Sequence, residues 1–225
     1  MMDNQKYLGL SNIDVFQDLS PDDLKEMDQT TTMSTCEPGR VFYAPEDTGE
    51  VLFLLKKGRV QLYRLSPDGK KLIVAILEEG SIFGEMSFIG QGMHNTFAES
   101  IDDCTLCVMS RQDIENLIQE KPLVGIRFME AMAVRLQKTE AKLEELAFKG
   151  IPARLSSLLL NLSAEENGAS IVDGYTHQDL AEMLGTYRET TTQILNNFKG
   201  AGWIEIGRKR IILLDQQAIS DVSEM

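Results

Sequence analysis

Arg188, Glu189 and Gln193 are a group of residues whose types and spacing suit the recognition of nucleic acid bases. An arginine can donate two hydrogen bonds to guanine, a glutamate can accept one from cytosine, and a glutamine can address adenine or a backbone group. Near the start of a helix, this spacing would bring all three side chains to base edges. Glu189 could instead cap that helix with Thr186, and Arg188 could contact phosphate alone. We expect a DNA half-site that contains a G and a paired-strand C.

Other residues of the C-terminal third could hold the DNA backbone. Thr176 and Gln178, at the start of a preceding short helix, are expected to contact phosphates together with that helix's first amides. Arg208 and Lys209 lie between two short apolar runs, 202–206 and 210–214, which predict a β-wing. The formal net charge is -13, yet residues 185–210 carry five bases and two acids. The sequence therefore predicts one basic face on an acidic molecule.

Two short helices must position these side chains. Thr176 precedes Asp179 by three residues and Thr186 precedes Glu189 by three, so each pair can form a capping box. The second pair has the usual Glu, and the first uses Asp and is the weaker signal. With Gly185 at the joint, the two helices predict a helix-turn-helix. Upstream of it, we expect a hinge at 150–152, a leucine-rich helix and a loop.

The segment 39–109 alternates short apolar runs with Gly and Pro. Strands are predicted at 51–55, 59–65, 72–77 and 104–109, with hairpin turn chemistry at 67–70. This spacing favours an antiparallel roll or barrel.

A long helix is expected to follow. Ser110 is the predicted N-cap of a short helix to Gln119, and a longer helix then runs past Pro122 to about Phe148. Its apolar positions recur at three- and four-residue intervals, which is typical of a coiled-coil seam between two copies. The alternative is an amphipathic helix packed on its own domain. The predicted dimer seam comprises Ile126, Met129, Ala133, Leu136, Leu143 and Ala147, with Glu140 at its one polar position.

Three sets of residues, in order along nearly the whole chain, carry a family resemblance. They are the run Gly80 to Glu85, the helix segment Arg135 to Phe148, and the run Thr176 to Ala181 with Gly185, Arg188 to Thr190 and Gly202 to Ile204. Together they resemble the cyclic AMP receptor protein and FNR family of bacterial transcription regulators. The resemblance implies a nucleotide-type pocket, a dimer helix and a DNA-reading helix, although Gln193 stands where the receptor has Arg.

The resemblance also implies an effector pocket. In cyclic-nucleotide-binding members a Glu holds the ribose, while an Arg and a neighbouring hydroxyl hold the cyclic phosphate. Here the Arg position is Asn95, which cannot supply the charge-assisted hydrogen bond. Cyclic AMP is therefore expected to bind weakly or not at all, and a different small-molecule effector is left open. The implied pocket residues are Phe83, Gly84, Glu85, Asn95, Thr96, Thr139 and Glu140.

Alternatives remain open for several of these residues. Glu85 could only cap a turn of the roll, and Glu140 could lie on a solvated face beside Lys138 or Lys142. His94 could bind haem, as in the carbon monoxide sensor of the family, but no second axial ligand is evident. Cys104 and Cys107 are three apart in a predicted strand and would face opposite sides, so no metal or cluster is expected.

We therefore predict an α+β protein with an N-terminal double-stranded β-roll of the cyclic-nucleotide-binding jelly-roll type at 1–120. A dimerisation helix follows at 121–149 and a winged helix-turn-helix at 150–225. Expected partners are double-stranded DNA with a near-palindromic operator, a second copy of the chain, and RNA polymerase. The signal sensed could instead be redox state or a haem-bound gas. No enzyme motif is present, no apolar run is long enough to span a membrane, and a cytoplasmic location is expected.

Overall fold

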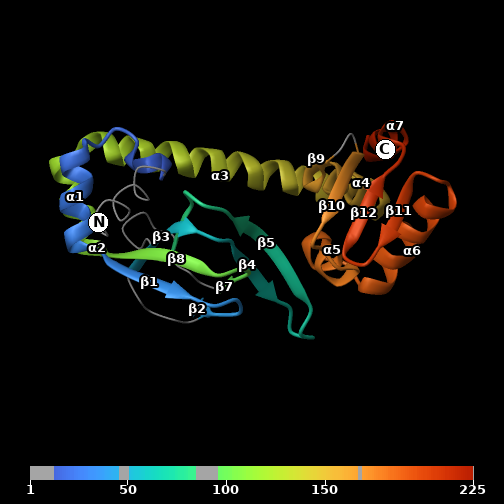
Figure 1. Ribbon diagram of the computed structural model, residues 1–225, viewed down its shortest axis with the longest axis horizontal. Coiled ribbons are helices and arrows are strands. Elements are labelled where there is room, and N and C mark those ends of the chain that lie inside the picture. The colour runs from blue at the N-terminus through green and yellow to red at the C-terminus, as the bar shows by residue number, and fades with distance from the viewer. Residues whose placement is uncertain (1–12, 46–50, 85–95, 167–168, 225) are drawn as a thin grey trace. The chain divides into compact units, whose positions relative to one another are not determined.

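The computed structural model describes residues 13–45, 51–84, 96–166 and 169–224. They divide into two compact units, one from within Met1–Leu65 and Val74–Gln137, the other from within Ser66–Ile73 and Lys138–Met225. Figure 1 labels their elements. The predicted domain boundaries, 120/121 and 149/150, fall between α2, α3 and α4, whereas the division into compact units falls inside α3. No helix in the described part of the chain is long and apolar enough to cross a membrane.

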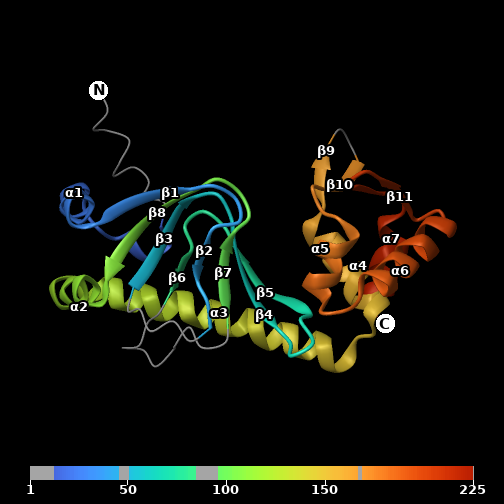
Figure 2. The same cartoon turned by 90° about the horizontal axis from the view of Figure 1, so that it is seen from below.

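The N-terminal part of the chain is a β-roll, as predicted. Its strands form two four-stranded antiparallel sheets, in the orders β1-β8-β3-β6 and β2-β7-β4-β5, seen from a second side in Figure 2. The bounds are β1 Thr32–Cys36, β2 Val41–Tyr43, β3 Val51–Lys57, β4 Val60–Leu65, β5 Lys71–Leu77, β6 Ile82–Gly84, β7 Phe97–Ser100 and β8 Cys104–Ser110. A 3-10 turn, Asp14–Phe16, and α1, Pro21–Thr30, precede them.

Aromatic and aliphatic side chains fill the space between the sheets. Phe83 on β6 is 2% exposed and stacks on Phe53 of β3, with ring centroids 5.0 Å apart. The neighbouring Gly84 has φ 118°, and a side chain there would collide with the carbonyl oxygen of Val51. The end of β6 can therefore approach β3 only as glycine.

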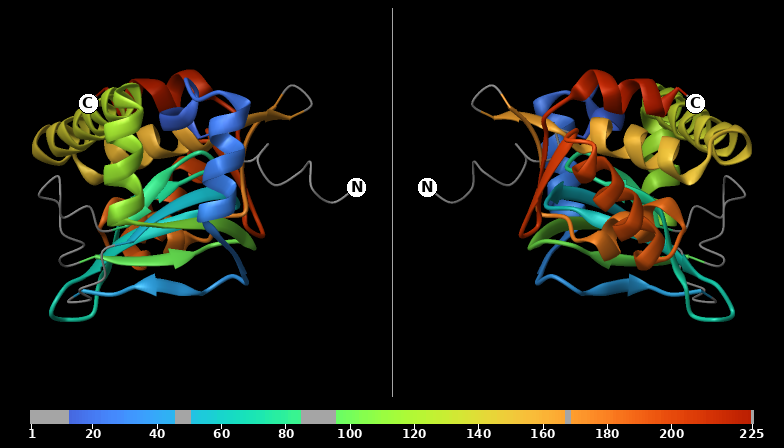
Figure 3. Two further views of the ribbon diagram at one scale, coloured as in Figure 1. Left: turned by 90° about the vertical axis from the view of Figure 1, so that its left-hand side faces the viewer. Right: turned by 90° about the vertical axis from the view of Figure 1, so that its right-hand side faces the viewer.

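Helices close one end of this unit. Ser110 caps α2 (Arg111–Glu120) through a capping box with Asp113, which confirms the predicted start of that helix. The long helix α3 follows as Pro122–Phe148. Its buried Val124 and Phe128 join a cluster that also contains Ile114 of α2. The left-hand view of Figure 3 looks onto α1, α2 and the start of α3.

The C-terminal part contains the predicted winged helix-turn-helix and a β-hairpin that was not predicted. A leucine-rich helix leads into a four-stranded antiparallel sheet of order β11-β12-β10-β9, and β9–β10 occupy the stretch that was expected to be a loop. Leu155, Leu159, Leu180, Leu195 and Phe198 are among its core residues. The bounds are α4 Ile151–Leu162, β9 Ala164–Glu166, β10 Ala169–Asp173, α5 His177–Leu184, α6 Arg188–Gly200, β11 Ile204–Gly207, β12 Arg210–Leu213 and α7 Gln216–Ser223.

Candidate nucleic-acid interface and effector region

The start of α5 is fixed by the capping box that the sequence favoured less. The Asp179 amide donates to Thr176 Oγ1 at 3.1 Å, and the Thr176 amide and hydroxyl both donate to Asp179 Oδ2 at 2.7 Å. The hydroxyl proton of Thr176 is therefore committed within the protein. Gln178 next to it is exposed, and its Nε2 donates to Glu182 Oε1 at 2.8 Å. Thr176 thus caps the start of the helix together with Asp179, while the Gln178 side chain is exposed.

The predicted capping box at α6 is wrong. Gly185 ends α5 with φ 65° and ψ 36°, and the Thr186 amide bonds back to Ala181 O at 2.9 Å. This six-to-one hydrogen bond is characteristic of the Schellman motif, so Thr186 belongs to the C-terminal end of α5. The N-cap of α6 is consequently Tyr187, and it makes no side-chain capping bond. Glu189 therefore takes no part in capping α6.

The outer face of α6 brings the predicted base-reading residues together. Arg188, Glu189 and Gln193 are exposed, whereas Thr191 and Leu195 on the same helix are buried. Three residues that the prediction missed lie beside them. They continue the four-residue spacing on this face, with Thr192 and Asn196 four and eight residues after Arg188, and Asn197 eight residues after Glu189. The six side chains that line this shallow hollow are Arg188, Glu189, Thr192, Gln193, Asn196 and Asn197.

His177 links the two helices of the motif. It is the first residue of α5 and is half-buried, with Nδ1 at 3.0 Å from Thr192 Oγ1 on α6. Burial lowers the pKa of His177 below its usual value, and the positive charge of Arg188 lowers it further. The sequence offered no signal for this contact, because the two residues are 15 positions apart and meet only when the helices pack.

The wing ends in a tight basic turn. Gly207 and Arg210 are paired residues of β11 and β12, which leaves Arg208 and Lys209 as the two-residue turn. Lys209 has φ 54°, the one positive φ of a non-glycine residue in the described ranges. Its carbonyl accepts the Gly174 amide at 2.8 Å. Both predicted phosphate-binding side chains are exposed here.

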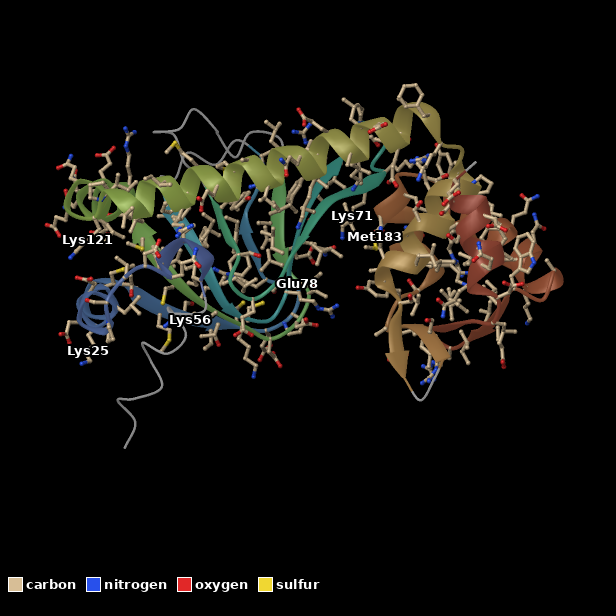
Figure 4. All side chains as sticks on the ribbon, turned by 90° about the horizontal axis from the view of Figure 1, so that it is seen from above. Lys25, Lys56, Lys71, Glu78, Lys121 and Met183 are labelled. Carbon is tan, nitrogen blue, oxygen red and sulfur yellow. The ribbon has the colours of Figure 1, made fainter. Side chains whose placement is uncertain are left out.

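One side of α3 is an uncovered apolar stripe. Met129 is 65% exposed and Leu143 is 66% exposed, and Glu140 lies on the same stripe, exposed and without an ion pair in the described part of the chain. Figure 4 shows side chains projecting from the outer side of this helix. All six predicted seam residues are exposed, namely Ile126, Met129, Ala133, Leu136, Leu143 and Ala147. Leu123, Val134, Leu146 and Phe148 lie at other positions of this helix and are also exposed.

The predicted effector pocket is described only in part. Glu85 and Asn95 lie outside the described residues, as does His94. Phe83 is buried among aromatic rings, so its side chain serves the core of the roll. Thr96 is half-buried. On α3, Thr139 and Glu140 are exposed.

The two cysteines of β8 face opposite sides, as expected. Cys104 packs in one core cluster and Cys107 in the other. Burial raises the pKa of Cys104 to about 11, and the neighbouring Cys36, its register partner on β1, adds to the rise. These thiols therefore belong to the packing of the roll.

Comparison with known proteins accounts for both parts of the chain. Residues 34–121 match the family described as cyclic nucleotide-binding domain, and residues 153–222 match the Crp-like helix-turn-helix domain. A CRP-like cAMP-activated global transcriptional regulator of Mycobacterium tuberculosis is 25% identical over 216 residues, which cover 94% of this chain and 96% of that protein. A global nitrogen regulator of Synechococcus elongatus is 30% identical over 192 residues, covering 82% and 86%.

The fold agrees with a solved structure as well. A regulator from Eubacterium rectale assigned to the crp/fnr family superposes with a TM-score of 0.77 at 21% identity, covering 96% of this chain and 100% of that one. These relatives are transcription regulators and not enzymes. Together, the β-roll, the long helix and the winged helix-turn-helix show that this chain belongs to the CRP/FNR family of transcription regulators.

Proposed function

We propose that this chain regulates transcription as a homodimer that reads double-stranded DNA with α6. The observation that carries the proposal is the outer face of α6, where Arg188, Glu189 and Gln193 are exposed around one hollow. Arg188 would donate to guanine O6 and N7, and Glu189 would accept from cytosine N4. Because Tyr187 is the N-cap, Glu189 has no capping duty that competes with this role.

Backbone contacts would set the register of the helix in the groove. Gln178, which is exposed, and the first amides of α5 would hold one phosphate group. Arg208 and Lys209 at the wing tip would hold another. A lysine in left-handed backbone is unfavourable by about 1 kcal/mol or more, so its presence at the turn favours a role for its charge.

The dimer would form through the stripe of α3. Exposed side chains as large as Met129, Leu136 and Leu143 in a heptad pattern are typical of a coiled-coil seam. A two-fold dimer carries two copies of α6, so the operator should be a near-palindrome with half-sites about one helical turn apart. We further propose that the bound dimer acts on RNA polymerase and works in the cytoplasm, where the DNA of a bacterial cell lies.

The N-terminal unit is proposed to sense a small molecule that modulates DNA affinity. Its match to the cyclic nucleotide-binding domain supports a ligand site in the roll. The Mycobacterium tuberculosis relative is named as cAMP-activated. In this chain, however, Asn95 replaces the arginine that the phosphate needs, so the effector we propose is one other than cyclic AMP.

The proposal is tested by selecting binding duplexes from a random pool with the full-length protein. We expect a palindromic consensus with a G·C pair in each half-site. Lys199→Ala is the matched control, because Lys199 is an exposed base in the last turn of α6, outside the hollow. It should return the same consensus as the unchanged protein, and Arg188→Ala should not. A pool without enrichment would refute the proposal.

A further inference from the structure

Thr192 lines the α6 hollow and is the partner of His177. Arg188, Thr192 and Asn196 follow one another at four-residue intervals and all line the hollow. The Thr192 hydroxyl oxygen is 3.0 Å from His177 Nδ1. A side chain of α5 therefore controls a hydroxyl that faces the proposed base-reading surface.

The protonation state and the tautomer of His177 together decide which way that hydroxyl donates. In the neutral tautomer that carries its proton on Nε2, Nδ1 accepts a hydrogen bond from the Thr192 hydroxyl, so Thr192 can only accept from a ligand in the hollow. We take this tautomer as the state of the free protein. An imidazolium donates from both nitrogens. The Nδ1–H of the imidazolium would then donate to Thr192 Oγ1. The Thr192 hydroxyl would be free to donate its own hydrogen bond into the hollow.

Burial, and after it the positive charge of Arg188, favour the neutral form of the His177 ring in the free protein. Helices α4 and α6 pack against α5. From α6 come Arg188, whose charge opposes protonation, and Glu189, which lies exposed in the hollow. From α4 comes Arg154, whose Nη1 donates to a carbonyl at the far end of α5, that of Leu184, at 3.0 Å.

The carboxylates on α5 itself are already engaged. Asp179 accepts both hydrogen bonds of the Thr176 cap, and Glu182 accepts from Gln178. A DNA phosphate arriving at the start of α5 would therefore be a new negative charge beside the ring. An opposite charge at short range favours the protonated form.

We propose that binding of DNA protonates His177, and that this positioning residue thereby turns Thr192 into a hydrogen-bond donor toward the DNA. The inference deepens the proposed function and rests on it. Its consequence is that protons and DNA bind together, so DNA affinity rises as the pH falls through the range between the pKa of His177 in the complex and its lower pKa in the free protein. One proton per subunit limits the gain to about tenfold per pH unit for each subunit bound.

Fluorescence anisotropy of a labelled operator duplex at constant ionic strength, between pH 6 and pH 8.5, measures this linkage. We expect the unchanged protein to gain about threefold to tenfold per pH unit and per subunit in the steepest region. His177→Gln keeps a partner for Thr192 but cannot titrate, and it should flatten the profile. The chain has two histidines, so His94→Gln is the matched control and should keep the slope. Thr192→Val should lose more affinity at pH 6 than at pH 8.

The outcomes separate this inference from the proposed function. DNA binding with the same pH slope in the His177→Gln and unchanged proteins would overturn the inference alone. Absence of DNA binding at every pH would overturn the proposed function and the inference with it. Should His177→Gln fail to fold, imidazole NMR of the unchanged protein decides: the His177 ring must titrate at higher pH with the duplex than without it, and an unmoved titration overturns the inference.

Discussion

Glu140 interrupts the apolar stripe of α3, and Glu140→Leu should tighten the dimer. The residue lies between Leu136 and Leu143 at the polar position of the heptad, and it is exposed in the single chain. In a two-fold coiled coil it would approach its own copy, so two carboxylates would repel each other and lose water. Full burial of a leucine side chain stabilises the buried state by about 1.5 to 3 kcal/mol relative to leaving it exposed.

Even half of that gain, contributed by both copies, amounts to about 1.5 to 3 kcal/mol per dimer. The dimer dissociation constant should therefore fall by about tenfold to a hundredfold, as measured by sedimentation equilibrium. Glu140→Gln isolates the charge. It should remove the dependence of dimerisation on salt while adding less affinity than the leucine, because the amide is still polar. Operator affinity without effector should rise in both variants, since the dimer is the DNA-binding form.

Lys138→Leu is the matched control, because Lys138 is exposed two residues away, off the seam, at the position facing away from it. It should leave the dissociation constant unchanged. If Glu140→Leu behaves like Lys138→Leu in both dimerisation and operator binding, Glu140 belongs to a solvated face and the seam assignment fails.

Three further predictions address the wing, the roll and the effector. In Lys209→Asn the new residue tolerates left-handed backbone, so the stability of the protein should be preserved. The loss of the positive charge should weaken binding to all duplexes about equally and reduce the salt slope of binding by about one per subunit. A loss of affinity that depends on the DNA sequence, measured in a competition assay, would contradict this. Since the folded state holds the pKa of Cys104 at about 11, against 9.0 for the ordinary thiol, the unfolded chain releases this proton first as the pH rises. Urea melts should show stability falling between pH 9 and pH 11, and a Cys104→Ala variant that falls equally would refute the assignment. Calorimetry should detect no micromolar binding of cyclic AMP, whereas Asn95→Arg should improve binding; micromolar binding to the unchanged protein that is lost in Glu85→Ala would reverse this account.

Regular patterns in the sequence predicted four strands of the roll, the long helix and the winged helix-turn-helix, but they did not locate β1, β2, β6 and β7. Alternation of polar and apolar residues located β4, now Val60–Leu65, and the predicted end of the long helix at Phe148 is confirmed. Strands β9 and β10 were missed, since Ala164–Glu166 is short and acidic and pairs only through β10 with the rest of the sheet. A strand of that kind depends on its neighbours and not on its own propensity.

The capping boxes show where local rules stop. Thr176 with Asp179 was the weaker motif and forms, whereas Thr186 with Glu189 was the stronger and does not. Because Gly185 adopts the left-handed conformation, the Thr186 amide bonds to the last turn of α5. Helix α6 therefore begins one residue later, and Thr186 is not its N-cap. Likewise, the hydrogen bond between His177 and Thr192 is a product of helix packing. Residue types led to the proposed base-reading group, but only the packing shows which neighbours contact it.

The most direct test of the account is a double-mutant cycle between Arg188 and the G·C pair of the selected half-site. Dissociation constants are measured for the unchanged protein and for Arg188→Ala, each on the consensus duplex and on a duplex with that pair replaced. A bidentate contact predicts that Arg188→Ala and the base change each cost about 1 to 3 kcal/mol and that their effects are not additive, because both remove the same contact. Additive losses, with Arg188→Ala discriminating between the two duplexes as well as the unchanged protein does, would contradict base reading by α6.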